Sequence, residues 1–186
     1  MKLPARMVKA AIAFSAVNDV RHYLCGIHVT SKFIEATNGH VAIQMSHGVK
    51  RAKKGIYAIK GKIPVKAISI EFVVTKRLCI ARLLDGFDNE IGVRQLEVID
   101  KKFPELQNKV IKEIMEKPIC NESIPRLNAC YIGIIDKAFD HPFVGCDMEF
   151  RGENTAVIVK LAGYPNELFG YPTIIIMPVN KGDKDK

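Results

Sequence analysis

The chain has 186 residues, of which 48% are hydrophobic and 26% are charged, and its formal net charge is +8 at pH 7. This composition is typical of a soluble globular protein that forms a core without a metal or disulfide staple. No apolar run approaches the roughly 20 residues of a membrane helix, and the N-terminal segment MKLPARMVK lacks the apolar stretch of a secretory signal. We therefore expect a cytoplasmic protein and exclude collagen, coiled coils, membrane channels and disordered chains. The excess of Lys and Arg favours nucleic acid or an acidic surface as a partner.

The first predicted element is a helix over residues 4–16, where apolar side chains repeat at helical spacing. Lys2, Arg6 and Lys9 are four and three residues apart, so we expect them to share another face of this helix. Such a face would present positive charge to a partner or to water.

Strand patterns follow the first helix and recur along the chain. The predicted strands cover residues 21–29, 33–37, 41–45, 55–59, 69–74, 78–83, 93–99, 144–150, 155–161 and 173–177. Asn38-Gly39 is the strongest hairpin signal, and a second helix is predicted over residues 127–139 with Asn128 as its cap. Residues 64–67 allow only a short helix, and residues 109–122 indicate a connection. The sequence thus predicts an α+β protein in which a helix-plus-meander unit occurs about three times.

The cysteines and histidines show no catalytic or metal-binding pattern. Five cysteines are present without a CxxC pair, and Cys25, Cys79 and Cys130 lie in apolar segments. We therefore expect reduced, buried and unreactive thiols. HExxH, GxSxG and a Gly-rich phosphate loop are all absent from the sequence. We predict no metal, no cofactor and no enzymatic activity, although a cysteine paired with a distant histidine remains open.

Several motifs, in the same order along the chain, resemble the bacterial DNA polymerase III beta subunit, the replicative sliding clamp. FS (14–15), DVRHYLCG (19–26) and ATNGH (36–40) are similar to FS, DVRYYLNG and ATDGHRLA of the middle clamp domain. IDKKFPEL (99–106) resembles LVDGRFPDYRRV, and IIIMPV (174–179) resembles the closing strand YVVMPM. Asn128 and Tyr131 match an N-x-x-Y helix start.

The resemblance implies a DNA-clamp-like α+β fold made of repeated helix-plus-antiparallel-strand units, about one and a half clamp domains in all. Residues 1–112 would correspond to the middle domain and residues 113–180 to the second half of the last domain. Residues 181–186 are charged, and we expect them to form a disordered tail. The reduced size favours a phage or prophage version of the family. A chain of about three half-units could close a clamp-sized ring as a tetramer, so a homo-oligomer is one expected assembly.

In the clamp family, the retained pieces line a groove that receives short peptides, similar to Gln-x-Leu-Phe, from polymerases and other replication proteins. The Leu-Phe pair of such a peptide needs a concave apolar pocket, and its Gln needs polar groups at the rim. Carried over residue by residue, the groove comprises Arg21, Tyr23, Leu24, Thr37, Gly39, His40, Pro104, Val110, Asn128, Tyr131, Ile175, Ile176, Met177, Pro178 and Val179. The alternative interpretation assigns these residues ordinary structural roles. The aliphatic side chains would then belong to the core of the strands, Gly39 to a turn, and Asn128 to a helix cap.

Two departures from the clamp pattern bear on this groove. Val41 and Ala42 stand where the family carries Arg and Leu, and losing the Leu predicts a shallower pocket. Residues 105–108 are ELQN instead of DYRR, so two arginines are absent.

A sliding clamp touches DNA through basic groups that contact phosphates without sequence preference. The residues that would contact double-stranded DNA here are Lys2, Arg6, Lys9, Lys50, Arg51, Lys53 and Lys54, and the alternative is that they form a solvated surface. We therefore expect a non-catalytic clamp-like protein of DNA replication or recombination, which binds DNA, clamp-binding peptides, or both. The alternatives are a monomeric adaptor or decoy that binds clamp-interaction peptides without encircling DNA, and a general basic nucleic-acid-binding protein. No membrane association is expected.

Overall fold

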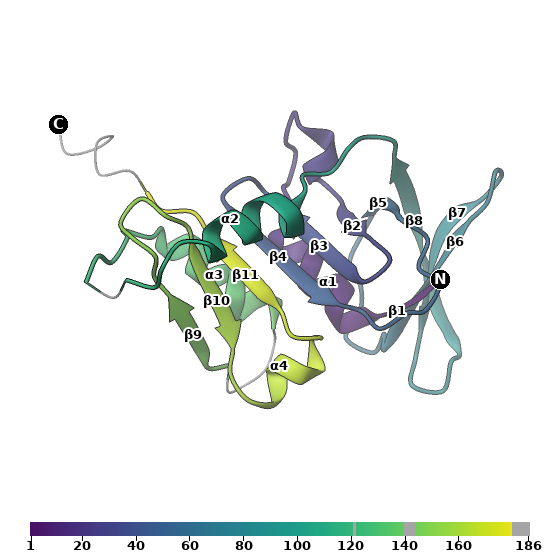
Figure 1. Cartoon of the computed structure of the whole chain (residues 1–186). Coiled ribbons are helices and arrows are strands. Elements are labelled where there is room, and N and C mark those ends of the chain that lie inside the picture. The colour runs from purple at the N-terminus through teal and green to yellow at the C-terminus, as the bar shows by residue number, and fades with distance from the viewer. Residues whose placement is uncertain (121, 140–143, 180–186) are drawn as a thin grey trace.

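A computed structural model describes residues 1–120, 122–139 and 144–179, and its strands form one sheet of eleven antiparallel strands (Figure 1). The strand order is β1-β6-β7-β8-β5-β2-β3-β4-β11-β10-β9. The strands are β1 (Lys2–Pro4), β2 (Ile27–Val29), β3 (Phe33–Thr37), β4 (Val41–Ser46), β5 (Gly55–Ile59), β6 (Ser69–Val74), β7 (Cys79–Leu84), β8 (Glu90–Ile99), β9 (Cys146–Glu149), β10 (Val157–Leu161) and β11 (Thr173–Ile176). The helical segments are α1 (Ala5–Phe14), the 3₁₀ turn η1 (His22–Leu24), the π-helical turn η2 (Leu106–Ile111), α2 (Lys112–Met115), α3 (Ala129–Ala138) and α4 (Tyr164–Leu168).

The first helix is confirmed, but Lys2 does not belong to it. Lys2 lies in β1, which pairs with β6 through Lys2 opposite Glu71. Pro4 is the last residue of β1, and the helix begins at Ala5. The expectation that Lys2, Arg6 and Lys9 share one helix face is therefore wrong. Arg6 is exposed and Lys9 half-buried on α1, whose buried face packs on the sheet.

Residues 21–25 form a turn where a strand was predicted. The carboxylate of Asp19 accepts hydrogen bonds from the backbone N–H and the guanidinium of Arg21, and this local bonding holds the chain in the η1 turn. Only Ile27–Val29 remain as strand β2. The apolar alternation that suggested a longer strand runs through Tyr23, Cys25, Ile27 and Val29. Only Ile27 and Val29 are buried in the strand, whereas Tyr23 and Cys25 are half-buried in and after the turn.

The second unit consists of β5 to β8 and has no helix. Residues 64–67 form only a turn, in which the N–H of Ala67 donates to the carbonyl of Pro64. β8 is longer than predicted and pairs with two different strands. Its first part, from Glu90 to Gln95, pairs with β7, and its last part, from Leu96 to Ile99, pairs with β5. This strand therefore joins the two halves of the sheet.

The third unit extends the sheet beyond β4. β11 pairs antiparallel with β4 through Ile174 opposite Ile43, and β10 and β9 follow outward. The predicted cap of α3 is confirmed, because the side chain of Asn128 accepts a 2.9 Å hydrogen bond from the N–H of Cys130. The short helix α4, which the sequence analysis did not predict, leads through Gly170 (φ +69°) into β11. The carbonyl of Gly170 accepts from the N–H of Ser46 at 2.8 Å and fixes the new unit to the end of β4.

The sheet is covered on both faces near β4 and β11, so there are two apolar clusters. α1 and α3 lie against one face, while η2 and α2 cross the other (Figure 1). Within β4, Val41 and Ile43 belong to the cluster on the α1 side, whereas Ala42 belongs to the cluster under η2. Because successive strand residues point to opposite faces, β4 serves both clusters.

The prediction of a connection over residues 109–122 is wrong for its first part. Leu106 and Ile111 both face the sheet although they are five residues apart, because the first turn is a π-helix. The segment is short and its apolar residues are separated by polar ones, so helical spacing is obscured in the sequence. Ile114 of α2 completes the buried stripe.

The thiols differ from expectation. No disulfide joins the five cysteines, but only Cys25, Cys79 and Cys120 are half-buried, whereas Cys130 and Cys146 are exposed. Cys130 lies in the first turn of α3, on a side that the sheet does not cover. Among the described residues, no helix is both long and apolar enough to cross a bilayer, and no group of His, Cys, Asp and Glu side chains is arranged to hold a metal ion. The predicted tail, residues 181–186, lies outside the described residues.

Candidate peptide-binding cavity

A half-open cavity of about 280 Å³ lies where four separate chain segments meet. We call it the anchor cavity. Most of its lining is apolar, and its walls come from the η1 turn, the β3–β4 hairpin, the segment that leads into α2, and β11. The lining residues are Arg21, Tyr23, Leu24, Thr37, Gly39, His40, Val41, Ala42, Pro104, Leu106, Val110, Ile175 and Met177. The structure therefore brings together most of the residues assigned to a groove from the sequence, and it adds Val41, Ala42 and Leu106.

Arg21 is held at the rim by Asp19. Two hydrogen bonds, at 3.0 and 2.8 Å, join the guanidinium to the two carboxylate oxygens. The hydrogen bond from the Arg21 side chain, together with that from its backbone N–H, lowers the pKa of Asp19 from 3.8 to about 2. The same hydrogen bond raises the pKa of Arg21. Asp19 and Arg21 therefore both stay ionised at all ordinary pH values. The guanidinium of Arg21 is held beside the β3–β4 hairpin, where it also donates to the carbonyl of Asn38.

The β3–β4 hairpin fits closely against this arginine. Gly39 has a φ of +93°, a conformation that favours glycine. A Cβ at Gly39 would lie 3.1 Å from Nη1 of Arg21, so the guanidinium rests against the bare backbone. The side chain of Asn38 accepts from the N–H groups of His40 and Val41 and completes the turn. The Asn-Gly signal in the sequence thus leads to one wall of the anchor cavity.

His40 links the hairpin to the third unit. Its carbonyl accepts a 2.8 Å hydrogen bond from the N–H of Met177, directly after β11. Its ring stacks on Tyr131 of α3, with the ring centroids 5.4 Å apart and the planes 13° from parallel. Tyr131 therefore supports His40 from behind and does not itself line the cavity.

Four other predicted groove residues lie outside the cavity. Ile176 is fully buried on the α1 side of the sheet, because it alternates with Ile175 and Met177. Asn128 is occupied as the cap of α3. Pro178 and Val179 continue past the rim, where the N–H of Val179 donates to the carbonyl of Arg126.

The depth of the cavity bears on one departure from the clamp pattern. Ala42 is buried and lines the cavity, among the apolar residues under η2. The expectation that the loss of Leu at this position makes the pocket shallower stays a prediction.

A buried polar network lies beside Phe103, the residue before Pro104 of the cavity wall, and it was not predicted from the sequence. His28, Glu35 and Gln44 lie opposite one another on neighbouring strands β2, β3 and β4. Glu35, only 4% exposed, accepts from the amide of Gln44 at 2.6 Å and is 2.8 Å from Nδ1 of His28. The ring of His28 stacks on Phe103 with centroids 4.6 Å apart. The network thus fixes the start of the segment that closes the anchor cavity.

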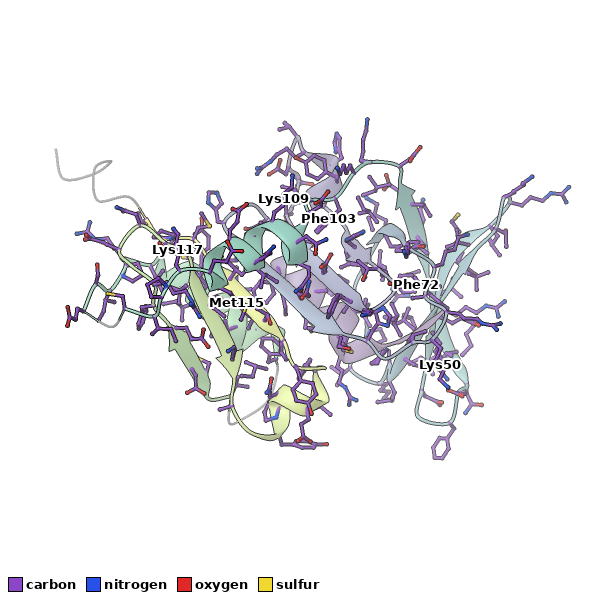
Figure 2. The ribbon with its side chains drawn as sticks, viewed as in Figure 1. Lys50, Phe72, Phe103, Lys109, Met115 and Lys117 are labelled. Atoms are coloured by element: carbon purple, nitrogen blue, oxygen red, sulfur yellow. The ribbon has the colours of Figure 1, made fainter. Side chains whose placement is uncertain are left out.

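The residues predicted to touch DNA lie elsewhere. Lys2 forms an ion pair with Asp88, and a hollow of about 410 Å³ brings Lys2 and Arg6 beside Val49, at the start of the basic loop. The side chains of Lys50, Arg51, Lys53 and Lys54 are exposed there, and Lys53 also donates to the carbonyl of Val74. Lys50 lies far from Lys109 and Phe103 (Figure 2). Lys9 is half-buried on α1 and does not line this hollow.

Comparison with known proteins identifies the fold. No family model matches the sequence, and no curated protein matches it. A DNA polymerase sliding clamp from Pseudomonas aeruginosa has a TM-score of 0.56 and 14% identity over 97% of this chain and 65% of that clamp. The sliding clamp from Caulobacter crescentus gives 0.59 and 14% over 97% and 65%. The DNA polymerase III beta chain from Streptococcus pneumoniae gives 0.60 and 10% over 97% and 64%.

The chain therefore has an α+β fold of the sliding-clamp type. It spans 65% of the length of the Pseudomonas clamp, which agrees with the expectation of about one and a half domains. The boundaries at residues 112 and 180 stay a prediction.

Proposed function

We propose that this chain is a non-catalytic, clamp-like protein of DNA replication or recombination whose anchor cavity binds short peptides of replication proteins. One observation carries the proposal: residues from four distant segments converge on a single apolar cavity within a sliding-clamp fold. If these residues served only as core and turn residues, the four segments could pack together without a cavity between them.

The chemistry of the anchor cavity suits an apolar peptide anchor. Its volume, about 280 Å³, is near the lower end of ligand pockets, which range from roughly 300 to 1,000 Å³. This is room for one or two large apolar side chains and not for a folded domain. Met177 is 42% exposed at the rim and can adapt to the shape of an occupant. Arg21 and His40 supply polar groups for a glutamine side chain at the edge.

Fluorescence anisotropy with a labelled Gln-Leu-Ser-Leu-Phe peptide tests this function, with Gln-Leu-Ser-Ala-Ala as the control peptide. We expect the first peptide to bind and the second to lose most of its affinity. Met177→Lys should abolish binding by placing a charge at the cavity mouth. The matched control is Met115→Lys, because Met115 is similarly exposed, at 49%, but does not line the cavity. No binding of the first peptide at millimolar concentration would reject the proposal.

The exposed Arg6 and the exposed cations of residues 50–54 support a contact with double-stranded DNA, whereas Lys2 is paired with Asp88 in a hollow that Asp85 also lines. Such binding is non-specific and weakens steeply with salt. The charge reversals Arg6→Glu and Lys50→Glu should lower the affinity for a duplex and reduce its salt dependence, without changing peptide binding.

Assembly can be tested separately. β1 and β9 are the outer strands of the sheet, and each has one neighbour in the strand order. Their free edges could pair with a second copy of the chain. Size-exclusion chromatography with light scattering should show a homo-oligomer if the protein encloses DNA. A monomer that binds the peptide but not DNA would identify it as an adaptor or decoy instead.

A further inference from the structure

A second hollow, of about 360 Å³, adjoins the anchor cavity. The two share the side chains of Tyr23, Pro104 and Val110, which form the divide between them. Lys102, Glu105 and Lys109 also line the second hollow. Lys109 and Phe103 lie close together at the start of the helical segment that crosses the sheet (Figure 2). A peptide seated in the anchor cavity could therefore continue directly into this second hollow.

The second hollow carries excess positive charge. Lys102 is 84% exposed and pairs with Glu105 at 3.3 Å, an exposed contact that exchanges readily with other partners. The ammonium group of Lys109 has no ion pair or side-chain hydrogen bond with any residue that the structure describes. Two lysines therefore face one carboxylate. In the anchor cavity, by contrast, the charge of Arg21 is already balanced by Asp19.

We propose that the second hollow is a subsite for an acidic side chain that flanks the apolar anchor of the bound peptide, an inference that rests on the proposed peptide-binding function. The partner would be a peptide with an Asp or Glu close to its apolar pair. An extended peptide advances about 3.3 Å per residue. Because the two hollows share lining side chains, an acidic residue only a few positions from the apolar pair could reach the second hollow. Lys109 is the principal contact and Lys102 the second.

The size of the effect follows from the exposure of the two lysines. Exposed ion pairs typically contribute between a few tenths and about 1 kcal/mol. Two contacts of about 0.3–0.7 kcal/mol each should therefore raise affinity about three- to tenfold. Since salt screens exposed charges, the gain should shrink when the ionic strength is raised.

The test compares Gln-Leu-Ser-Leu-Phe peptides that carry Asp-Glu or Asn-Gln after the Phe, and a second pair with the same residues before the Gln. We expect one of the two acidic peptides to bind about three- to tenfold more tightly than its neutral counterpart. Lys109→Glu should remove this difference while leaving the affinity for the neutral peptide unchanged. The matched control is Lys112→Glu, which changes the net charge equally at an exposed lysine that lines neither hollow.

Equal binding of acidic and neutral peptides by the unaltered protein would overturn the acidic subsite and leave the peptide function standing. The same conclusion follows if Lys112→Glu removes the difference as fully as Lys109→Glu does, because the effect would then come from net charge. Failure of every peptide to bind would overturn the peptide function and the subsite together.

Discussion

Replacement of Glu35 by alanine should destabilise the protein far more than replacement of an exposed glutamate. The carboxylate is 4% exposed and interacts with the amide of Gln44 and the ring of His28. Without the Glu35 carboxylate, Gln44 and His28 both lose their hydrogen-bond partner at a buried position. An orphaned buried polar group costs about 1–3 kcal/mol. Because the His28 side chain is partly exposed and can reach water, we expect a total of about 3 kcal/mol.

For a chain of this length, each 1 kcal/mol lowers the melting temperature by about 2–4 °C, so Glu35→Ala should lower it by roughly 6–12 °C. Calorimetry or thermal unfolding followed by circular dichroism measures this. Glu97→Ala is the control, because Glu97 is half exposed and pairs with Lys60 at 3.1 Å, and an exposed pair contributes about 1 kcal/mol at most. Similar melting temperatures for the two variants would refute the claim that the network supports the cavity wall.

Three further predictions concern a cap, a glycine and a titration. Asn128→Ala should lower the free energy of unfolding by about 1 kcal/mol, measured by urea denaturation, with Asn128→Asp as the variant that keeps the cap; equal losses would contradict the cap. Gly170→Ala should lower the free energy of unfolding by well over the roughly 1 kcal/mol that we expect for Gly48→Ala in the same assay. Both glycines have positive φ, but only at Gly170 would a Cβ meet a backbone oxygen, at 2.0 Å; equal costs would exclude that clash. Asp19, whose pKa is lowered to about 2 by Arg21, should stabilise the fold fully above about pH 4 and lose this effect toward pH 2. Carboxyl NMR follows it, and a midpoint near 4 would mean that the pair does not form in solution.

Local patterns in the sequence predicted the elements whose determinants are themselves local. The Asn38-Gly39 hairpin, the strands on either side of it and the cap at Asn128 depend on residues within a few positions of one another, and all three are present. Alternation along a strand also shows why Ile175 and Ile176 could not both line one cavity. The sequence analysis placed them together because it carried over a motif without applying this period.

The remaining features depend on contacts between distant segments. Glu35 and Gln44 are opposite each other only because of the register of β3 and β4, and the ring of Phe103, from a distant segment, stacks on their partner His28. No single stretch of sequence contains this arrangement. The segment of residues 106–115 was missed for a related reason, since its π-helical turn spaces its buried side chains by five residues.

The pairing of β11 with β4 has a consequence for how the protein matures. The anchor cavity needs the η1 turn near the beginning of the chain and Met177 near the end of the described residues, so it exists only after the last strand has docked. Contacts between residues so distant in sequence form late and slowly, because a long loop must close first. The anchor cavity is therefore incomplete in a nascent chain whose last strand has not yet docked, and in a chain cleaved before residue 173, although both would contain the β3–β4 hairpin.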